Sequence, residues 1–197
     1  RDKENDKGQG YRIDVEDKRN LQLAGKKFTW QSTAGFEHVG KDFAPLERLR
    51  AVEFLRDWGL PFAAPAAKEK IVRALSGISD AKGNLLSYGL DNYTRGQAYS
   101  GVRHRINFYQ DFLGWQWRSV FQMTNFDDST RSGKFFRPGA GIDKTLKHLS
   151  NISVGAQYQL EHNSIVDDRS GSIAPGSFSF HDWRAYVKAK EGSRNRW

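Results

Sequence analysis

Nine segments of this chain alternate apolar and polar residues with a period of two, which is the period of a β-strand whose two faces have different surroundings. In the clearest of them, GWQWRSVFQMTNF, every second residue from Trp115 to Met123 is apolar apart from Ser119, and the residues between them are polar apart from Val120. The nine expected strands cover 11–23, 28–37, 70–79, 86–90, 102–109, 115–124, 136–143, 152–161 and 183–189. Alternation over so many short segments predicts an all-β chain.

The links between these segments alternate in length. Short links are expected at 24–26, 80–84, 111–114 and 147–150, longer ones at 39–69, 127–133 and 162–177, and a connector at 94–98. Hairpins that are short at one end and long at the other are typical of transmembrane β-barrels. The predicted fold is therefore an antiparallel up-and-down meander that forms an outer-membrane β-barrel or part of one.

The number of strands bears on the extent of the domain. A bacterial single-chain barrel normally has an even number of strands, and nine is odd. We therefore expect residues 11–197 to form a β-barrel-type domain that is incomplete. Residues 1–10 are charged and lack an apolar anchor, so we expect this segment to be disordered.

Composition excludes several classes of protein. The 197 residues are 38% hydrophobic and 13% aromatic, and none is cysteine. No run approaches the roughly 18–20 apolar residues that a membrane-spanning helix needs, whereas barrel strands need apolar residues on one face only. The absence of cysteine excludes thiol catalysis and thiolate metal sites.

The alternation assigns side chains to the two faces of the expected barrel wall. The residues expected to face lipid are Trp115, Trp117, Phe121, Met123, Tyr158 and Trp183. The residues expected to line a polar lumen are Arg103, Arg105, Arg118, Arg137 and Arg184. The aromatic set also fits a stacking platform for sugars or the core of a soluble sandwich, and the arginines also fit the solvent face of a soluble sheet.

The net charge of +8 raises a nucleic-acid hypothesis, because clustered Lys and Arg neutralise phosphates. The charges are spread over loops and alternate strand positions, which favours a solvated face or a polar lumen over specific nucleic-acid binding. The histidines lack metal-ligand spacing, so we assign no metal and no cofactor. The pairs Asp127 and Asp128, and Asp167 and Asp168, lack the spaced ligands of a calcium loop, and turn roles are favoured.

The link 39–69 holds three prolines and a segment of mixed charge. Leu46, Leu49 and Val52 recur at helical spacing, which predicts a short helix inside this link. A further hypothesis places an enzyme site in the loops 39–69 and 163–177. The sequence has no nucleophile elbow, zinc-protease helix or dinucleotide fingerprint, and we expect no catalysis.

Three phrases, PLERLRAVEFLRDWGLP, WQWRSVFQMTNF and GAQYQLEHN, resemble segments of large predicted outer-membrane β-barrel proteins of Bacteroidota. The resemblance extends over residues 28–189 and includes no motif with assigned functional residues. It implies an outer-membrane location and a chain longer than this one.

The expected function is that of an outer-membrane β-barrel protein with a structural, transport or envelope-assembly role. Its expected partners are membrane lipid and other envelope proteins. The alternative is a soluble β-sandwich that binds glycans or another polyanion through its aromatic residues and arginines.

Overall fold

The computed structural model describes residues 9–41, 52–60, 67–149 and 152–188. Nine strands form one sheet, ordered as they follow along the chain, and every neighbouring pair is antiparallel. The strands are β1 (Gly10–Leu23), β2 (Lys26–Val39), β3 (Glu69–Asp80), β4 (Leu85–Arg95), β5 (Tyr99–Phe112), β6 (Trp115–Asp127), β7 (Arg131–Leu146), β8 (Ile152–Asp167) and β9 (Phe178–Lys188).

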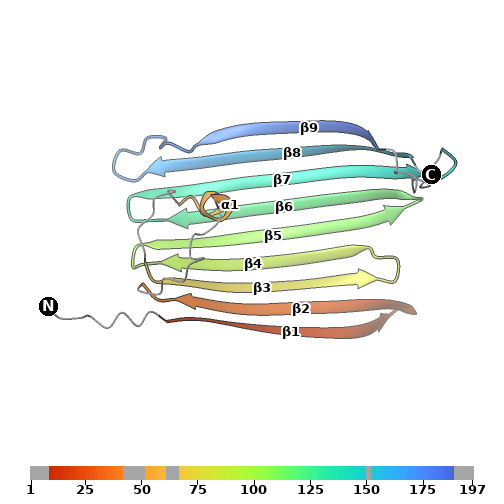
Figure 1. Cartoon of the computed structure of the whole chain (residues 1–197), viewed down its shortest axis with the longest axis horizontal. Helices are drawn as coiled ribbons and strands as arrows, with labels where there is room; N and C mark the ends of the chain where they lie inside the picture. Colours follow the sequence, from red (N-terminus) through yellow and green to blue (C-terminus); the bar gives the residue numbers. More distant parts are fainter. Residues whose placement is uncertain (1–8, 42–51, 61–66, 150–151, 189–197) are drawn as a thin grey trace, which may run out of the picture.

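The strands lie side by side in one layer, and helix α1 (Val52–Asp57) lies over the sheet near one end (Figure 1). The predicted fold class, an all-β antiparallel up-and-down meander, is confirmed. Among the described residues the sheet is open, with β1 and β9 at its two edges, and it does not close into a barrel. The predicted short helix begins at Val52, while Leu46 and Leu49 lie outside the described residues.

The two ends of the sheet differ in their links. At one end, the turn end, the links are 24–25, 81–84, 113–114 and 147–151. At the other, the loop end, they are 40–68, 96–98, 128–130 and 168–177. The loop end therefore combines two long links with two links of only three residues, so the regular short and long alternation expected from the sequence is broken there.

The predicted long link 127–133 is wrong, because β6 ends at Asp127 and β7 begins at Arg131. The carboxylate of Asp128 accepts hydrogen bonds from the backbone N–H groups of Thr130 at 3.2 Å and Arg131 at 2.8 Å. These bonds close a tight turn, so the polar residues that follow are strand residues. For the same reason β7 is longer than the expected strand 136–143.

Successive side chains of a strand point to opposite faces, and the ladder register extends this division across the sheet. One face, called the apolar face, carries side chains that include Ile13, Phe36, Val72, Leu86, Ile106, Phe121, Phe136, Tyr158 and Trp183. The other, called the polar face, carries side chains that include Glu16, Gln31, Arg73, Asp91, Arg105, Arg118, Arg137, Gln157 and Arg184.

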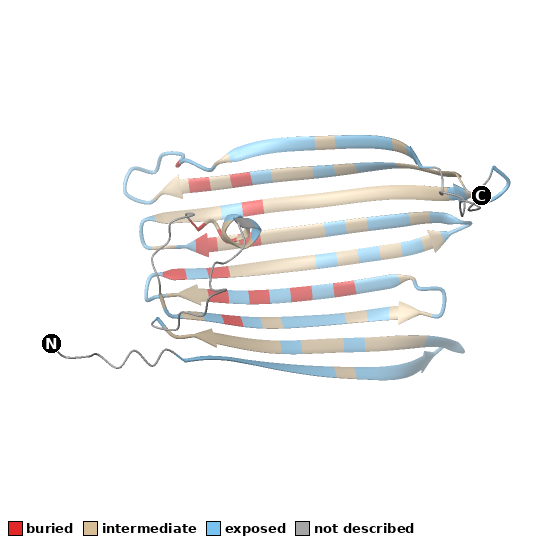
Figure 2. Cartoon of the chain, viewed as in Figure 1, coloured by how far each residue is buried: buried red, intermediate tan, exposed pale blue. Residues whose placement is uncertain are grey.

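The hydrophobic core is small and lies on the polar face at the loop end. It comprises Trp58, Leu60, Ile71, Tyr93, Tyr99, Phe126, Phe135, Ile165 and Ala174. Figure 2 shows most buried residues in the loop-end half of the sheet, close to α1. The apolar face, in contrast, is widely exposed, with Ile13 at 59% and Trp183 at 75% of full exposure.

The turn between β5 and β6 generates a stability prediction. Leu113 and Gly114 both have positive φ, 54° and 77°, as a type I′ turn requires. Leucine in this region is strained by about 1–2 kcal/mol, and asparagine adopts it more readily. We expect Leu113→Asn to raise the free energy of unfolding by about 1 kcal/mol, measured by thermal unfolding followed by circular dichroism. Leu149→Asn is the control, since Leu149 is an exposed turn residue without positive φ. An equal gain in both variants would contradict the strain.

Candidate functional site

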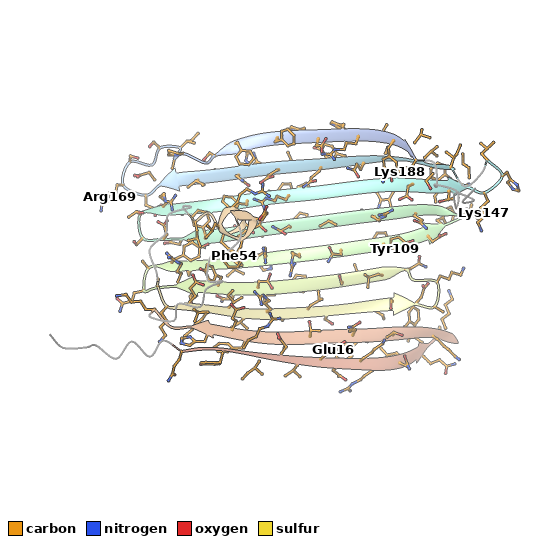
Figure 3. All side chains as sticks on the ribbon, viewed as in Figure 1. Glu16, Phe54, Tyr109, Lys147, Arg169 and Lys188 are labelled. Carbon is orange, nitrogen blue, oxygen red and sulfur yellow. The ribbon has the colours of Figure 1, made fainter. Side chains whose placement is uncertain are left out.

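Residues 52–60 lie against the polar face at the loop end, and we call them the anchored segment. The indole of Trp58 is fully buried, and its ring centroid lies 5.2 Å from that of Tyr93. The hydroxyl of Tyr99 donates a hydrogen bond to the carbonyl oxygen of Trp58. Phe54, labelled in Figure 3, packs edge-on against Tyr93 at 5.3 Å. Aromatic packing therefore holds this segment on the sheet.

Glycines make room for these rings. A Cβ at Gly101 would lie 2.9 Å from the indole of Trp58, and a Cβ at Gly133 or Gly59 would overlap the ring of Phe126. Gly59 also has a φ of 65°, which favours glycine. The ring of Phe126 stacks on Tyr99 at 5.8 Å. These three glycines are therefore explained by packing.

Ion pairs tie the anchored segment to the sheet. Asp57 pairs with Arg103 at 3.3 Å and with Arg137. Arg103 also pairs with Asp91 at 2.7 Å, and its guanidinium lies 4.8 Å from the ring centroid of Trp58. The network continues through Arg105, which pairs with Asp91 at 3.2 Å, and through Arg137, which pairs with Glu161 at 2.8 Å.

The charged side chains of this network are buried or half-buried. The side chain of Asp91 is only 1% exposed, and those of Arg103 and Arg137 are 13% and 10% exposed. Charges removed from water are tolerated only when they are paired and hydrogen-bonded. The network fixes the position of the anchored segment, and it has no group arranged as a nucleophile with a base.

All five predicted arginines lie on the polar face, but the structure brings only three of them together. Arg103, Arg105 and Arg137 belong to the network, whereas Arg118 pairs with Asp143 and Arg184 pairs with Asp182. Sequence reasoning missed the acidic partners Asp57, Asp91 and Glu161. Asp91 and Glu161 lie on the same strand face as the arginines, so the alternation of the sequence could have identified them as partners. Asp57 lies in the link between β2 and β3, and alternation does not predict the path of a link.

The six residues predicted to face lipid all lie on the apolar face. The rings of Tyr158 and Trp183 are neighbours, with centroids 4.1 Å apart. Phe121 packs edge-on against Phe136, and Lys144 lies over the ring of Trp115 at 5.2 Å. Their contact with lipid stays a prediction.

Three of the four loop aspartates serve the turns, whereas Asp168 accepts a hydrogen bond from the hydroxyl of Ser132 on β7. Asp127 accepts a hydrogen bond from the N–H of Ser129, and Asp167 accepts bonds from the N–H groups of Arg169 and Ser170. Burial raises the pKa of Asp128, but hydrogen bonds from Arg131 and Thr130 outweigh it and lower the pKa overall. Among the described residues, no group of three acidic or histidine side chains is placed to hold a metal ion.

Comparison of this chain with protein-family models, with curated proteins and with solved structures finds no match. Within the described ranges, no helix has the length and apolar character needed to cross a membrane.

Removal of one carboxylate tests the importance of the network. We expect Asp91→Asn to lower the free energy of unfolding by about 3–5 kcal/mol, because two arginines lose a buried partner. The control is Asp14→Asn on β1, whose pair with Arg12 joins side chains that are 54% and 60% exposed and contributes little to stability. Denaturant unfolding measures both, and equal losses would show that burial of the network is unimportant.

Proposed function

We propose that this chain forms part of the wall of an outer-membrane β-barrel, with its apolar face against lipid and its polar face toward the interior. Its role is structural, or in transport or envelope assembly, without catalysis. The observation that carries the proposal is the exposed apolar face that continues across nine strands. An apolar surface of this extent requires a partner that shields it from water. A bilayer can shield an apolar surface of any width.

The polar atoms of the apolar face support contact with lipid, because several pair with one another. Tyr88 and His104 share a hydrogen bond of 2.8 Å, and Tyr158 and His181 share one of 3.0 Å. The indole N–H groups donate to nearby hydroxyls, Trp30 to Ser76 at 2.8 Å and Trp117 to Ser119 at 2.6 Å. In hydrocarbon an unpaired polar group costs several kcal/mol, so lateral pairing is what a lipid-facing surface needs.

The limit of the apolar side chains crosses the strands diagonally. Toward the loop end, the last apolar residue of this face is Val72 on β3 and Trp183 on β9. Through the ladder pairs, Val72 is level with Asn125 of β6, whereas Trp183 is level with Ser119 of β6.

Between β3 and β9 the limit shifts by six residues over six strand steps, about one residue per strand on average, although Val102 of β5 is level with Val72 and Val166 of β8 lies on this face beyond the limit. With ~3.3 Å per residue and ~4.8 Å between strands, this shift corresponds to an angle of about 35°. Barrel strands tilt by about 35–45° in a membrane, so a level bilayer fits this diagonal limit.

The two edges of the sheet indicate how the wall is completed. Both β1 and β9 run from the loop end to the turn end, so they are parallel to each other. An antiparallel barrel therefore requires an odd number of further strands between them. The strands also lie side by side without rolling up in Figure 1, which favours a wide barrel.

The soluble sandwich is the rival function, and it requires a second layer over the apolar face. In the described part of the chain, the anchored segment covers the polar face instead. The barrel wall is therefore the better supported proposal.

A matched pair of substitutions tests the proposal. Ile106 on the apolar face and Leu75 on the polar face are both 40% exposed. An arginine at a lipid-facing midplane site costs about 2–4 kcal/mol, and in the lumen it costs little. We expect Ile106→Arg to reduce insertion into lipid vesicles strongly and Leu75→Arg to leave it unchanged.

Flotation of vesicles with the full chain measures insertion. Equal effects of the two substitutions would contradict the assignment of faces. A monodisperse β-sheet protein obtained without detergent would overturn the membrane proposal and favour the sandwich.

A further inference from the structure

Two glycines of β7 have no explanation in backbone conformation or packing. Neither Gly139 nor Gly141 has positive φ, and among the described residues a Cβ on either would meet no atom closer than 3.5 Å outside its chain neighbours. Glycine weakens a strand interior, and it often marks a place where a ligand approaches the backbone closely. By contrast, a Cβ at Gly155 would lie 2.6 Å from the ring of Tyr186.

The two glycines form the floor of a hollow of about 300 Å³ on the polar face. Its walls include Arg137 of β7 itself and side chains of β6, β8 and β9: Arg118, Gln157, Gln159 and Tyr186. A side chain at either glycine would project into this space. The missing side chains therefore create the hollow.

The positive charges around the hollow are already matched. Arg118 pairs with Asp143, and Arg137 pairs with both Asp57 and Glu161. Such pairing leaves little net positive potential for an anion. The hollow therefore suits a neutral ligand.

The wall groups define the chemistry of that ligand. Gln157 and Gln159 are exposed amides, each with donors and an acceptor. Within the described residues, the Nε–H of Arg137 is buried and has no hydrogen-bond partner. The ring of Tyr186 lies over Gly155, with the ammonium of Lys188 4.5 Å from the ring centroid, and it contributes aromatic surface and a hydroxyl to the lining. A sugar ring matches this set, because its hydroxyls both donate and accept and its C–H groups form an apolar face.

We propose that the hollow over Gly139 and Gly141 is a binding site for a neutral saccharide. It lies on the polar face, so in a barrel it would be a site on the inner wall. The proposal goes beyond the barrel assignment and does not require it, because the hollow is independent of what covers the apolar face.

The experiment is a titration of the full chain, in detergent or in buffer as its solubility demands, with maltohexaose, cellohexaose and xylohexaose. Calorimetry or saturation-transfer NMR detects binding. We expect saturable binding of at least one of these probes. Gly141→Leu, which fills the floor, and Gln157→Ala, which removes one amide, should each weaken it at least tenfold.

The control is Gln31→Ala, which removes an exposed amide from the same face, five strands away from β7, and it should leave binding unchanged. Circular dichroism verifies that each variant keeps its β-structure. Absence of binding by all three probes overturns the proposal, as does binding that Gly141→Leu leaves intact. Tighter binding of hexagalacturonate, with competition by inorganic phosphate, would show an anion site instead. Failure of vesicle insertion leaves these outcomes unaffected.

Discussion

The pleat of a β-strand sends successive side chains to opposite faces, and in a single-layer sheet it leaves no third environment for them. The chain places apolar residues in one phase through nine strands and charged residues in the other. Hydrophobic burial normally brings such an apolar face against a second layer. Here the face is exposed, with Trp183 at 75%, so the medium or partner that covers it decides how the chain is stabilised. The sheet, its charged face and its open edges all follow from that one constraint.

The polar face is stabilised in a different way. Its strands carry arginines and carboxylates, which pair with one another. At the loop end these strands bind the anchored segment through Asp57 and Trp58. The result inverts the usual arrangement, because the small buried core of Trp58, Tyr93 and Phe126 lies on the charged side of the sheet. Aromatic rings fill the spaces that Gly101 and Gly133 leave, and ion pairs surround them. Both kinds of contact therefore hold the anchored segment on the polar face.

Alternation in the sequence was sufficient to predict the all-β class and which candidate residues share a face, since both depend on the period of two. The meander order was predicted from the short links, which join neighbouring antiparallel strands. Alternation was insufficient where a side chain closes a turn: Asp128 accepts hydrogen bonds from the backbone N–H groups of two residues, Thr130 and Arg131, that composition assigns to a long loop. It was also insufficient for the anchored segment, because the position of Asp57 depends on the path of a link with no periodicity. The hollow above Gly139 and Gly141 could be found only in the three-dimensional structure, because a glycine in a strand is informative only when the side chains around it are known.

For the proposed barrel, the diagonal limit of the apolar face bears on the tilt of the strands, and the parallel edges bear on their number. An average shift of about one residue per strand fits tilted strands, and tilted strands close into a barrel only with a matching stagger. Parallel edges exclude antiparallel closure of β1 on β9. Two copies arranged around a common barrel axis would again bring β9 of one beside β1 of the other in parallel. In the proposed barrel, the further strands between β9 and β1 must therefore be odd in number, and each must present its apolar side chains to the same face as Ile13 and Trp183.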